Sequence, residues 1–232
     1  MFNHLAQIYF KDKKMFNPNP VTQEFFSAVE IINGKCSLTN SGEKKERPTI
    51  VIVLESPHRS EYNDAGAALR SANGNTGKKL KANLEQKIDR VIKNGLLKLS
   101  AGTYNLYAVN AIQYQCSFGV KPIQPELRNT VFRTLWPSLK VDFINRLKQL
   151  KPIVIINMCT GGIKAIGDYI ANTANTAKSS KYIKNLLSKE LPLNLMVHMS
   201  LVDYVSEMGS IDYYYCVHPS SKNFKRVDLK KV

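Results

Sequence analysis

The chain has 232 residues, of which 44% are hydrophobic and 22% are charged. This balance excludes an intrinsically disordered protein and provides enough apolar residues for a full hydrophobic core. Lys and Arg outnumber Asp and Glu by 33 to 18, which gives a formal net charge of +15 and predicts a polyanionic partner such as DNA.

Segments typical of strands and helices alternate along the chain. An amphipathic helix is expected over 21–32, and the polar residues 37–48 predict a loop. Four apolar runs predict strands over 49–54, 104–109, 153–157 and 213–217. The segments between them predict helices over 77–95, 126–149, 160–172 and 181–189. The stretch 173–181 is rich in Ser, Thr and Asn and is typical of a surface insertion.

Three of the predicted strands are nearly continuous in apolar character, as are parallel strands that are buried on both faces. Their alternation with helices predicts an α/β fold, a three-layer α/β/α sandwich with a central four-stranded parallel sheet. We expect a single domain over 1–232, in which 1–48 form an N-terminal helical decoration and 222–232 form a basic tail.

Several kinds of site and location are disfavoured by the motifs that the sequence lacks. The four cysteines are widely spaced without a C-x-x-C pair, which argues against a disulfide scaffold, a zinc knuckle and an iron–sulfur cluster. The first residues, Met1-Phe2-Asn3-His4, do not resemble a secretory signal. No apolar run approaches the roughly 20 residues that span a membrane. We therefore expect a cytoplasmic monomer away from membranes, with no metal and no cofactor.

Polar groups suited to nucleic-acid chemistry follow the predicted strands. Glu55-Ser56-Pro57-His58 follows the first strand, Asn110 the second, and His218-Pro219-Ser220-Ser221-Lys222 the fourth. Ligands of open α/β sheets bind beyond the carboxyl ends of the strands, so we expect these groups to meet at one edge. An Asn amide can read the edge of a base, and small hydroxyls beside a lysine suit a phosphate-binding turn. Two alternatives stay open, namely Asn110 as a turn residue and His218 as a structural histidine.

The order of these motifs resembles the uracil-DNA glycosylase superfamily over roughly residues 49–221. The first motif is similar to GQDPYH of some members, and more similar to GEAPGxxE of the thermostable iron–sulfur branch. The residues that fall on its E, A, P and second E are Glu55, Ser56, Pro57 and Glu61. The residues that resemble the following G-x-x-G-x-x-L segment are Gly74, Gly77 and Leu80. Asn110 falls on the asparagine that reads the base, and His218-Pro219-Ser220 falls on the HPS turn.

The resemblance implies a DNA glycosylase that flips a nucleotide out of the duplex and hydrolyses its N-glycosidic bond, leaving an abasic site. Glu55 would position water or stabilise the sugar cation, Asn110 would orient the base, and His218 would donate to a base oxygen as negative charge develops there. The residues expected to bind the base are Ser56, Pro57, His58, Glu61 and Ala72. The residues expected to contact DNA are Lys78, Lys79, Ser220, Ser221, Lys222 and Phe224, the last two pressing toward the gap left by flipping.

Two departures from the family pattern change the expected substrate. Ser56 stands at the position of the catalytic Asp of some members, so water activation would fall to Glu55, Glu61 or His58. Ala72 stands where an aromatic ring stacks on uracil, and the loss of a stacking surface worth roughly 1–3 kcal/mol leaves space. We therefore expect a modified or bulky pyrimidine, either a damaged base in base-excision repair or a modified base of phage DNA in anti-phage defence.

Two other interpretations stay open. Ser56 could mark a non-catalytic nucleic-acid-binding protein on the same scaffold that has lost its general base. Alternatively, Cys159 and the pair Gly161-Gly162 could form the substrate loop of an enzyme that acts on free nucleotides.

Overall fold

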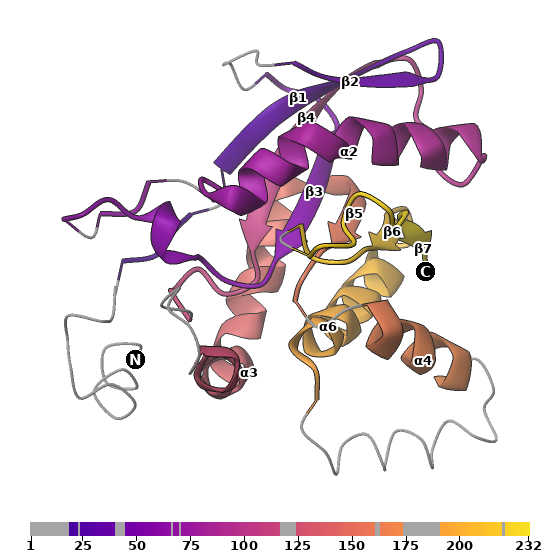
Figure 1. The fold of residues 1–232 in the computed structure, drawn as a ribbon. Helices are drawn as coiled ribbons and strands as arrows, with labels where there is room; N and C mark the ends of the chain where they lie inside the picture. Colours follow the sequence, from indigo (N-terminus) through magenta and orange to yellow (C-terminus); the bar gives the residue numbers. More distant parts are fainter. Residues whose placement is uncertain are drawn as a thin grey trace.

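The computed structural model describes residues 19–22, 24–39, 45–65, 67–69, 71–116, 124–160, 163–173, 191–219 and 221–232. A curled seven-stranded mixed sheet forms the centre of this part of the chain, with helices beside it (Figure 1). The strands are β1 (Glu24–Ile32), β2 (Lys35–Thr39), β3 (Thr49–Leu54), β4 (Gly102–Asn110), β5 (Pro152–Asn157), β6 (Asp212–Tyr215) and β7 (Lys230–Lys231). The helices are the 3-10 helix η2 (Arg59–Glu61), α2 (Asn75–Lys93), α3 (Gln124–Leu150), α4 (Ile163–Thr173) and α6 (Leu193–Met208).

The strands of the sheet are arranged in the order β2-β1-β4-β3-β5-β6-β7. β4, β3, β5 and β6 pair in parallel, and the sequence located all four of them. Every residue of β3 is buried, as its unbroken apolar run predicted. The sheet is larger than the expected central sheet of four parallel strands, because β1, β2 and β7 extend it in antiparallel orientation at its two ends.

The segment 21–32 contains strand β1 and not the expected amphipathic helix. β1 and β2 form a hairpin joined by Asn33 and Gly34, which both have positive φ (51° and 71°). Positive φ at both central residues is the geometry of the tight turn that Asn-Gly favours between antiparallel strands. Over residues 24–39 the same hairpin replaces the helical decoration expected within 1–48, and it places the start of the expected loop 37–48 inside β2.

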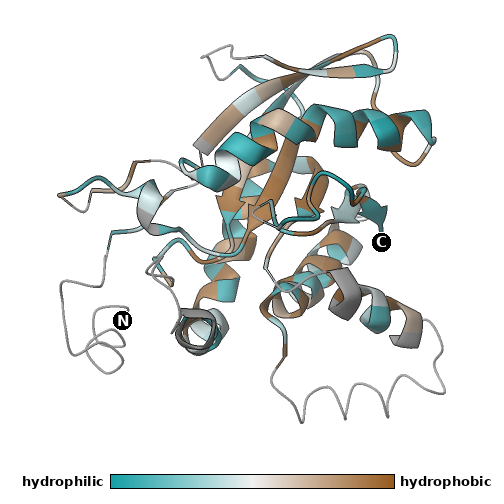
Figure 2. Cartoon of the chain, in the orientation of Figure 1, coloured by the Kyte–Doolittle hydropathy of each residue, from teal (hydrophilic) through white to brown (hydrophobic). Residues whose placement is uncertain are grey.

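Helices pack on both faces of the sheet, as the alternation of buried side chains along β3 requires. Ile50 and Ile52 point to the face that α2 covers, while Val51 and Val53 point to the face that α3 and α6 cover. Figure 2 shows the central strands as the most hydrophobic part of the chain and α2 as largely hydrophilic on its outer side. Each face of the sheet therefore has its own hydrophobic core.

Helix α2 also covers the free edge of β2. The carboxylate of Glu85 accepts a hydrogen bond from the backbone N–H of Leu38 at 2.6 Å, and the carboxylate of Asp89 accepts one from Cys36. Both N–H groups belong to the edge strand of the sheet. The two acidic residues thus tie the helix to the rim of the sheet.

The remaining helices agree in part with the expected ones. α3 runs without interruption through Pro137, and α4 begins at Ile163. The expected helix over 181–189 and most of the expected insertion 173–181 lie outside the described residues. α6 was not expected; it starts after Pro192 and ends at Gly209, which has a φ of 68°. No helix within the described ranges is both long enough and apolar enough to cross a membrane.

Candidate functional site

A cavity of ≈ 470 Å³ opens beyond the carboxyl ends of the parallel strands. β3 connects forward to its neighbour β4 on one side, whereas β5 connects forward to β6 on the other. Crevices at such a reversal of strand order are where open α/β sheets bind ligands. The lining residues are Leu54, Glu55, Ser56, Pro57, His58, Ser60, Glu61, Gly74, Asn75, Thr76, Arg128, Thr160 and His218. The cavity thus joins the two motifs, far apart in the sequence, that were expected to meet here.

Glu55 supplies a buried carboxylate to this cavity, with only 4% of the residue exposed. Its Oε1 lies 3.3 Å from Nε of Arg128, and Thr160 donates from both its hydroxyl and its backbone N–H. Burial raises the pKa of Glu55, while Arg128 and Thr160 oppose that rise. Within the described part of the chain, Oε2 has no hydrogen-bond partner. The carboxylate therefore carries one buried oxygen that the described residues leave without a hydrogen bond.

Arg128 of α3 was not predicted as a site residue. Its Nε and Nη2 lie 3.2 and 3.1 Å from Oδ1 of Asn129, in addition to the contact with Glu55. Nη1 has no acceptor among the residues that the structure describes. No sequence signal pointed to this arginine, because a single cation on a helix belongs to no motif. The guanidinium lines the cavity with one amino group open.

His218 also lines the cavity, three residues after the end of β6. Burial lowers its pKa to about 4, with Arg128, Lys79 and His58 contributing repulsion in the same direction. The imidazole is therefore neutral near pH 7 and able to donate a hydrogen bond without carrying charge. Its carbonyl accepts a hydrogen bond from the N–H of Ser221 at 2.9 Å, which closes the turn.

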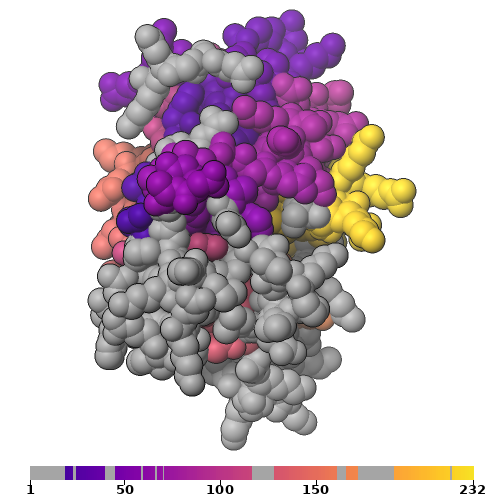
Figure 3. Space-filling model, turned by 60° about the vertical axis from the view of Figure 1, so that its left-hand side comes forward, coloured from indigo at the N-terminus to yellow at the C-terminus, as the bar shows by residue number. Residues whose placement is uncertain are grey.

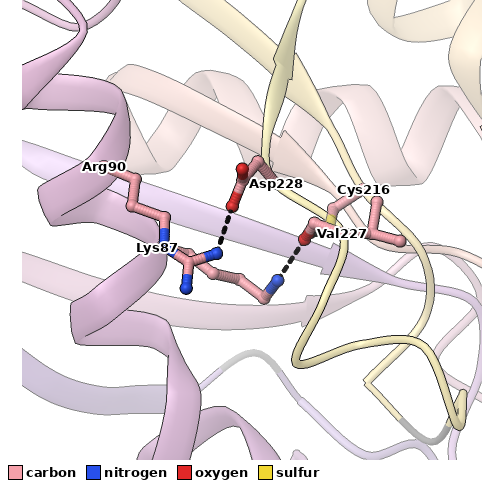
Figure 4. Close-up of polar contacts among 5 residues, drawn as sticks. All are labelled: Lys87, Arg90, Cys216, Val227 and Asp228. Atoms are coloured by element: carbon pink, nitrogen blue, oxygen red, sulfur yellow. Dashed lines mark hydrogen bonds and ion pairs between the residues drawn. The ribbon is translucent and has the colours of Figure 1, made fainter.

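The turn that carries His218 is held by α2. Lys87, which is 1% exposed, donates to the carbonyl of Val227 (Figure 4). The Lys87 Nζ also lies 4.4 Å from the centre of the Phe224 ring. One turn further along α2, Arg90 pairs with Asp228 at 2.7 Å. The C-terminal segment is consequently fixed against α2, beside which it lies in Figure 3.

Asn110 lies behind the cavity wall and not on it. Its Nδ2 is 3.2 Å from Oε2 of Glu61 and 3.4 Å from Oγ of Ser71, while its Oδ1 has no partner among the described residues. Arg146 of α3 donates to the carbonyls of Asn110 and Ala111 at 2.9 and 3.0 Å. The end of β4 is therefore held by hydrogen bonds to α3, and Asn110 contacts Glu61, which lines the cavity.

Glu61 is the second carboxyl group of the cavity. Burial raises its pKa to about 7, against the opposing effect of hydrogen bonds from Asn110 and from the backbone N–H groups of His58 and Ala72. The group is therefore half protonated near neutral pH. A half-protonated carboxyl group can both give and accept a proton, which suits general acid–base chemistry.

Three further expected residues also line the cavity. Ser56 is half-buried, Pro57 is buried and His58 is exposed. Nδ1 of His58 accepts from the backbone N–H of Ser60 at 3.3 Å, so the proton of the neutral ring is assigned to Nε2. Partial desolvation of the ring lowers the pKa of His58.

Ala72 does not line the cavity but lies in the core beneath α2, with a φ of 56°. Its carbonyl oxygen would lie 1.7 Å from a Cβ placed on Gly77, so only glycine fits at that position. The pattern of glycines that was read as a family segment therefore has a packing role here. Ala72 contributes to the site through its N–H, which bonds to Glu61.

The expected DNA-contacting residues fall into three groups. Lys78 and Lys222 are exposed, and Lys79 lies near enough to His218 to lower its pKa. Ser221 is half-buried in the turn, and Ser220 lies outside the described residues. Phe224 is 1% exposed in the core beneath Lys87, so the wedge role expected for it does not fit its position.

Comparison with models of protein families, with curated proteins and with solved structures finds no match. No group of three or more His, Cys, Asp or Glu in the described ranges could hold a metal ion. The chemistry available to the cavity therefore has to be inferred from its own side chains: a buried carboxylate, a second carboxyl group that titrates near neutrality, a guanidinium and a neutral imidazole.

Proposed function

We propose that the chain is a DNA glycosylase of the uracil-DNA glycosylase type, which hydrolyses the N-glycosidic bond of a flipped, modified pyrimidine. The observation that carries this proposal is a cavity lined by both Glu55, a buried carboxyl group whose Oε2 has no partner among the described residues, and His218, a neutral imidazole. An oxocarbenium-like sugar needs a carboxylate or an activated water molecule beside it, and the departing base needs a hydrogen-bond donor.

Glu55 and His218 take complementary parts in this reaction. Glu55 accepts a proton from water, or stabilises the positive charge on the sugar, through Oε2. His218 donates a hydrogen bond to a base oxygen on which negative charge develops. Asn110 is held by Glu61 and orients the base only through that residue or after it moves.

The size of the cavity and the kinds of residue in its wall favour a base larger than uracil. Its volume is ≈ 470 Å³, and none of the described residues that line it is Phe, Tyr or Trp. A pocket without these rings gives less stacking to a small flat base, while its Ser, Thr, Asn and Glu side chains can bond the added groups of a modified one. A bulky modified pyrimidine, as in phage DNA, is therefore the substrate class that we favour over uracil.

The proposal includes a fold and a partner. The parallel run β4-β3-β5-β6, with α2 on one face and α3 and α6 on the other, supports a three-layer α/β/α sandwich around four parallel strands. The net charge of +15 supports DNA as the partner. Exposed Lys78 and Lys222 stand next to segments that line the cavity, where they would meet the phosphates of a bound strand.

An abasic-site assay tests the proposal. DNA duplexes and single strands that contain uracil, 5-hydroxymethylcytosine or glucosylated 5-hydroxymethylcytosine are incubated with the protein and then with alkali, which cleaves at abasic sites. We expect cleavage of a bulky modified substrate. Glu55→Gln and His218→Ala should each lower the rate by about 10²–10⁴-fold without loss of DNA binding. Lys140→Gln, at an exposed position of α3 away from the cavity, is the matched control.

Each other outcome has a defined meaning. Cleavage of uracil DNA alone would refute the bulky substrate while keeping the glycosylase. Intact DNA on every substrate together with tight, salt-sensitive binding would favour a non-catalytic nucleic-acid-binding protein. Hydrolysis of free nucleotides without any polymer would identify a nucleotide enzyme instead.

A further inference from the structure

Arg128 is a cation in the cavity wall that takes no part in the steps assigned to Glu55 and His218. Arg128 lines the cavity wall and contacts Glu55, yet the contacts of its guanidinium involve only Nε and Nη2 among the described residues. The side chain is 23% exposed, so its position is partly desolvated. A charged donor in such a setting interacts more strongly with a nearby negative charge than it would in water.

We infer that Arg128 is a catalytic and specificity-determining residue of this site, which binds the departing base as an anion through Nη1. The inference rests on the proposed glycosylase function. It narrows the substrate class to bases that leave with a negative charge. Bases that already carry a positive charge, such as N7-alkylated purines, would be repelled.

The bond changes explain why the cation matters. The bond between C1′ and the base nitrogen breaks, and its electron pair stays on the base. The oxygen of water forms a new bond to C1′, and the proton of that water passes to Glu55. The base leaves as an anion and takes up a proton afterwards. A positively charged base would leave as a neutral molecule, to which Arg128 offers no stabilisation.

The surrounding charges fit this role. Arg128 acts on both Glu55, whose ionised form it favours, and His218, whose protonated form it disfavours. Lys79 adds a second positive charge that acts on His218. Arg128 therefore opposes the burial that raises the pKa of Glu55, and it adds to the burial that lowers the pKa of His218. Its Nη1 also has no acceptor among the described residues.

The test compares wild type, Arg128→Gln, Arg128→Lys and the control Lys140→Gln in single-turnover excision. The substrates are DNAs with the base that the wild type excises, with its 5-fluoro or otherwise more acidic analogue, and with 7-methylguanine. We expect Arg128→Gln to lose about 10²–10³-fold on the poorer leaving group and clearly less on the more acidic analogue. Arg128→Lys should keep part of the activity, because the lysine ammonium group keeps the positive charge but lacks the planar donor geometry of the guanidinium. Wild type should leave 7-methylguanine in place.

The possible results distinguish a failure of the proposed glycosylase function from a failure of the role inferred for Arg128. A wild type that excises no base from any DNA refutes the glycosylase and the inference together. A wild type that excises a pyrimidine, with an equal loss in Arg128→Gln on every leaving group, overturns the inference alone and leaves Arg128 as a partner of Glu55. Excision of 7-methylguanine by the wild type overturns it as well. If Arg128→Gln does not fold, as its thermal unfolding would reveal, Arg128→Lys provides the same comparison of leaving groups.

Discussion

The amide nitrogen Nδ2 of Asn110 lies 3.2 Å from Oε2 of Glu61, and the two residues are 1% and 4% exposed. This contact joins the end of β4 to the 3-10 helix η2, whose Glu61 lines the cavity. The protonation state of Glu61 therefore decides what the cavity wall presents to a ligand.

Glu61→Gln should change the pH dependence of stability. The pKa of Glu61 is about 7 in the folded protein against a usual 4.5, so the folded state binds the proton more tightly. The stability from this group is present below pH 4.5 and is lost as the pH rises through 7. Because glutamine cannot ionise, the variant should gain roughly 2–3 kcal/mol relative to wild type between about pH 5 and pH 8. Urea unfolding at several pH values measures this difference. A constant difference, or the same trend in the exposed control Glu207→Gln, would contradict the assignment.

His218 and His198 should stay neutral across the physiological range. Burial lowers the pKa of each to about 4. Their ring signals in carbon–proton NMR spectra should therefore not move between about pH 5.5 and pH 8, where an ordinary histidine titrates. His218→Gln assigns the signal. Lys79→Gln should raise the pKa of His218 by removing a positive neighbour and leave His198 unchanged. A midpoint near 6.5 for His218 in the wild type would be incompatible with its half-buried position beside Arg128 and Lys79.

Lys87→Met should destabilise the protein more than Arg90→Gln does. Lys87 is buried and bonds to the carbonyl of Val227, so its loss leaves a buried acceptor poorly satisfied and costs about 1–3 kcal/mol. Arg90 forms an exposed ion pair with Asp228, and such pairs contribute about 0–1 kcal/mol. Thermal unfolding measures both changes, and hydrogen exchange over 221–229 should rise only in Lys87→Met. Equal effects of the two variants would contradict the role of Lys87 as the buried anchor.

Gly77→Ala should lower both stability and activity. The added Cβ would meet the carbonyl oxygen of Ala72 at 1.7 Å, so the loop has to move, with a cost of about 1–3 kcal/mol. The N–H of Ala72 bonds to Glu61, so the movement reaches the cavity. Gly167→Ala in α4 is the control, because its Cβ would meet only the hydroxyl of Tyr215 at 3.8 Å. The control should be neutral or slightly stabilising, since alanine favours helix. A Gly77→Ala protein with wild-type melting temperature and rate would exclude this packing constraint.

Lys78→Gln and Lys222→Gln should each weaken DNA binding through charge alone. Both side chains are exposed beside segments of the cavity. Loss of one lysine–phosphate contact should reduce the magnitude of the slope of log K, the binding constant, against log salt concentration by about 0.9 for duplex DNA. Fluorescence anisotropy at several salt concentrations measures the slope. An unchanged slope in both variants, as expected for the Lys140→Gln control, would place the DNA on another surface.

The sequence predicted the central strands well because they are buried on both faces and read as unbroken apolar runs. β1 was mistaken for a helix, since its apolar residues fit either periodicity, although Asn33-Gly34 marked a hairpin. α6 was missed because it is apolar on several sides and has no clear helical period, although Pro192 and Gly209 mark its ends.

The sequence predicted the site residues that directly follow strands, and it missed those whose positions depend on tertiary packing. Glu55 and His218 meet at the cavity because both follow parallel strands. Arg128 reaches the same cavity from a helix, and no local pattern reveals such a position. Phe224 stands in a basic segment and reads as an exposed aromatic residue, but Lys87 and the core beneath α2 bury it.

The carboxylates of Glu85 and Asp89 have a consequence for the behaviour of the chain in a crowded solution. A strand at the rim of a sheet usually offers its N–H groups to any other extended chain, which makes such rims starting points for aggregation. On β2, the N–H groups of Cys36 and Leu38 already bond to side chains of α2. At the opposite rim, β7 has only two residues, both exposed lysines. Within the described residues, neither rim offers a long row of free N–H groups to a foreign strand. We therefore expect α2 at one end, and the short, charged β7 at the other, to oppose aggregation through the edges of the sheet.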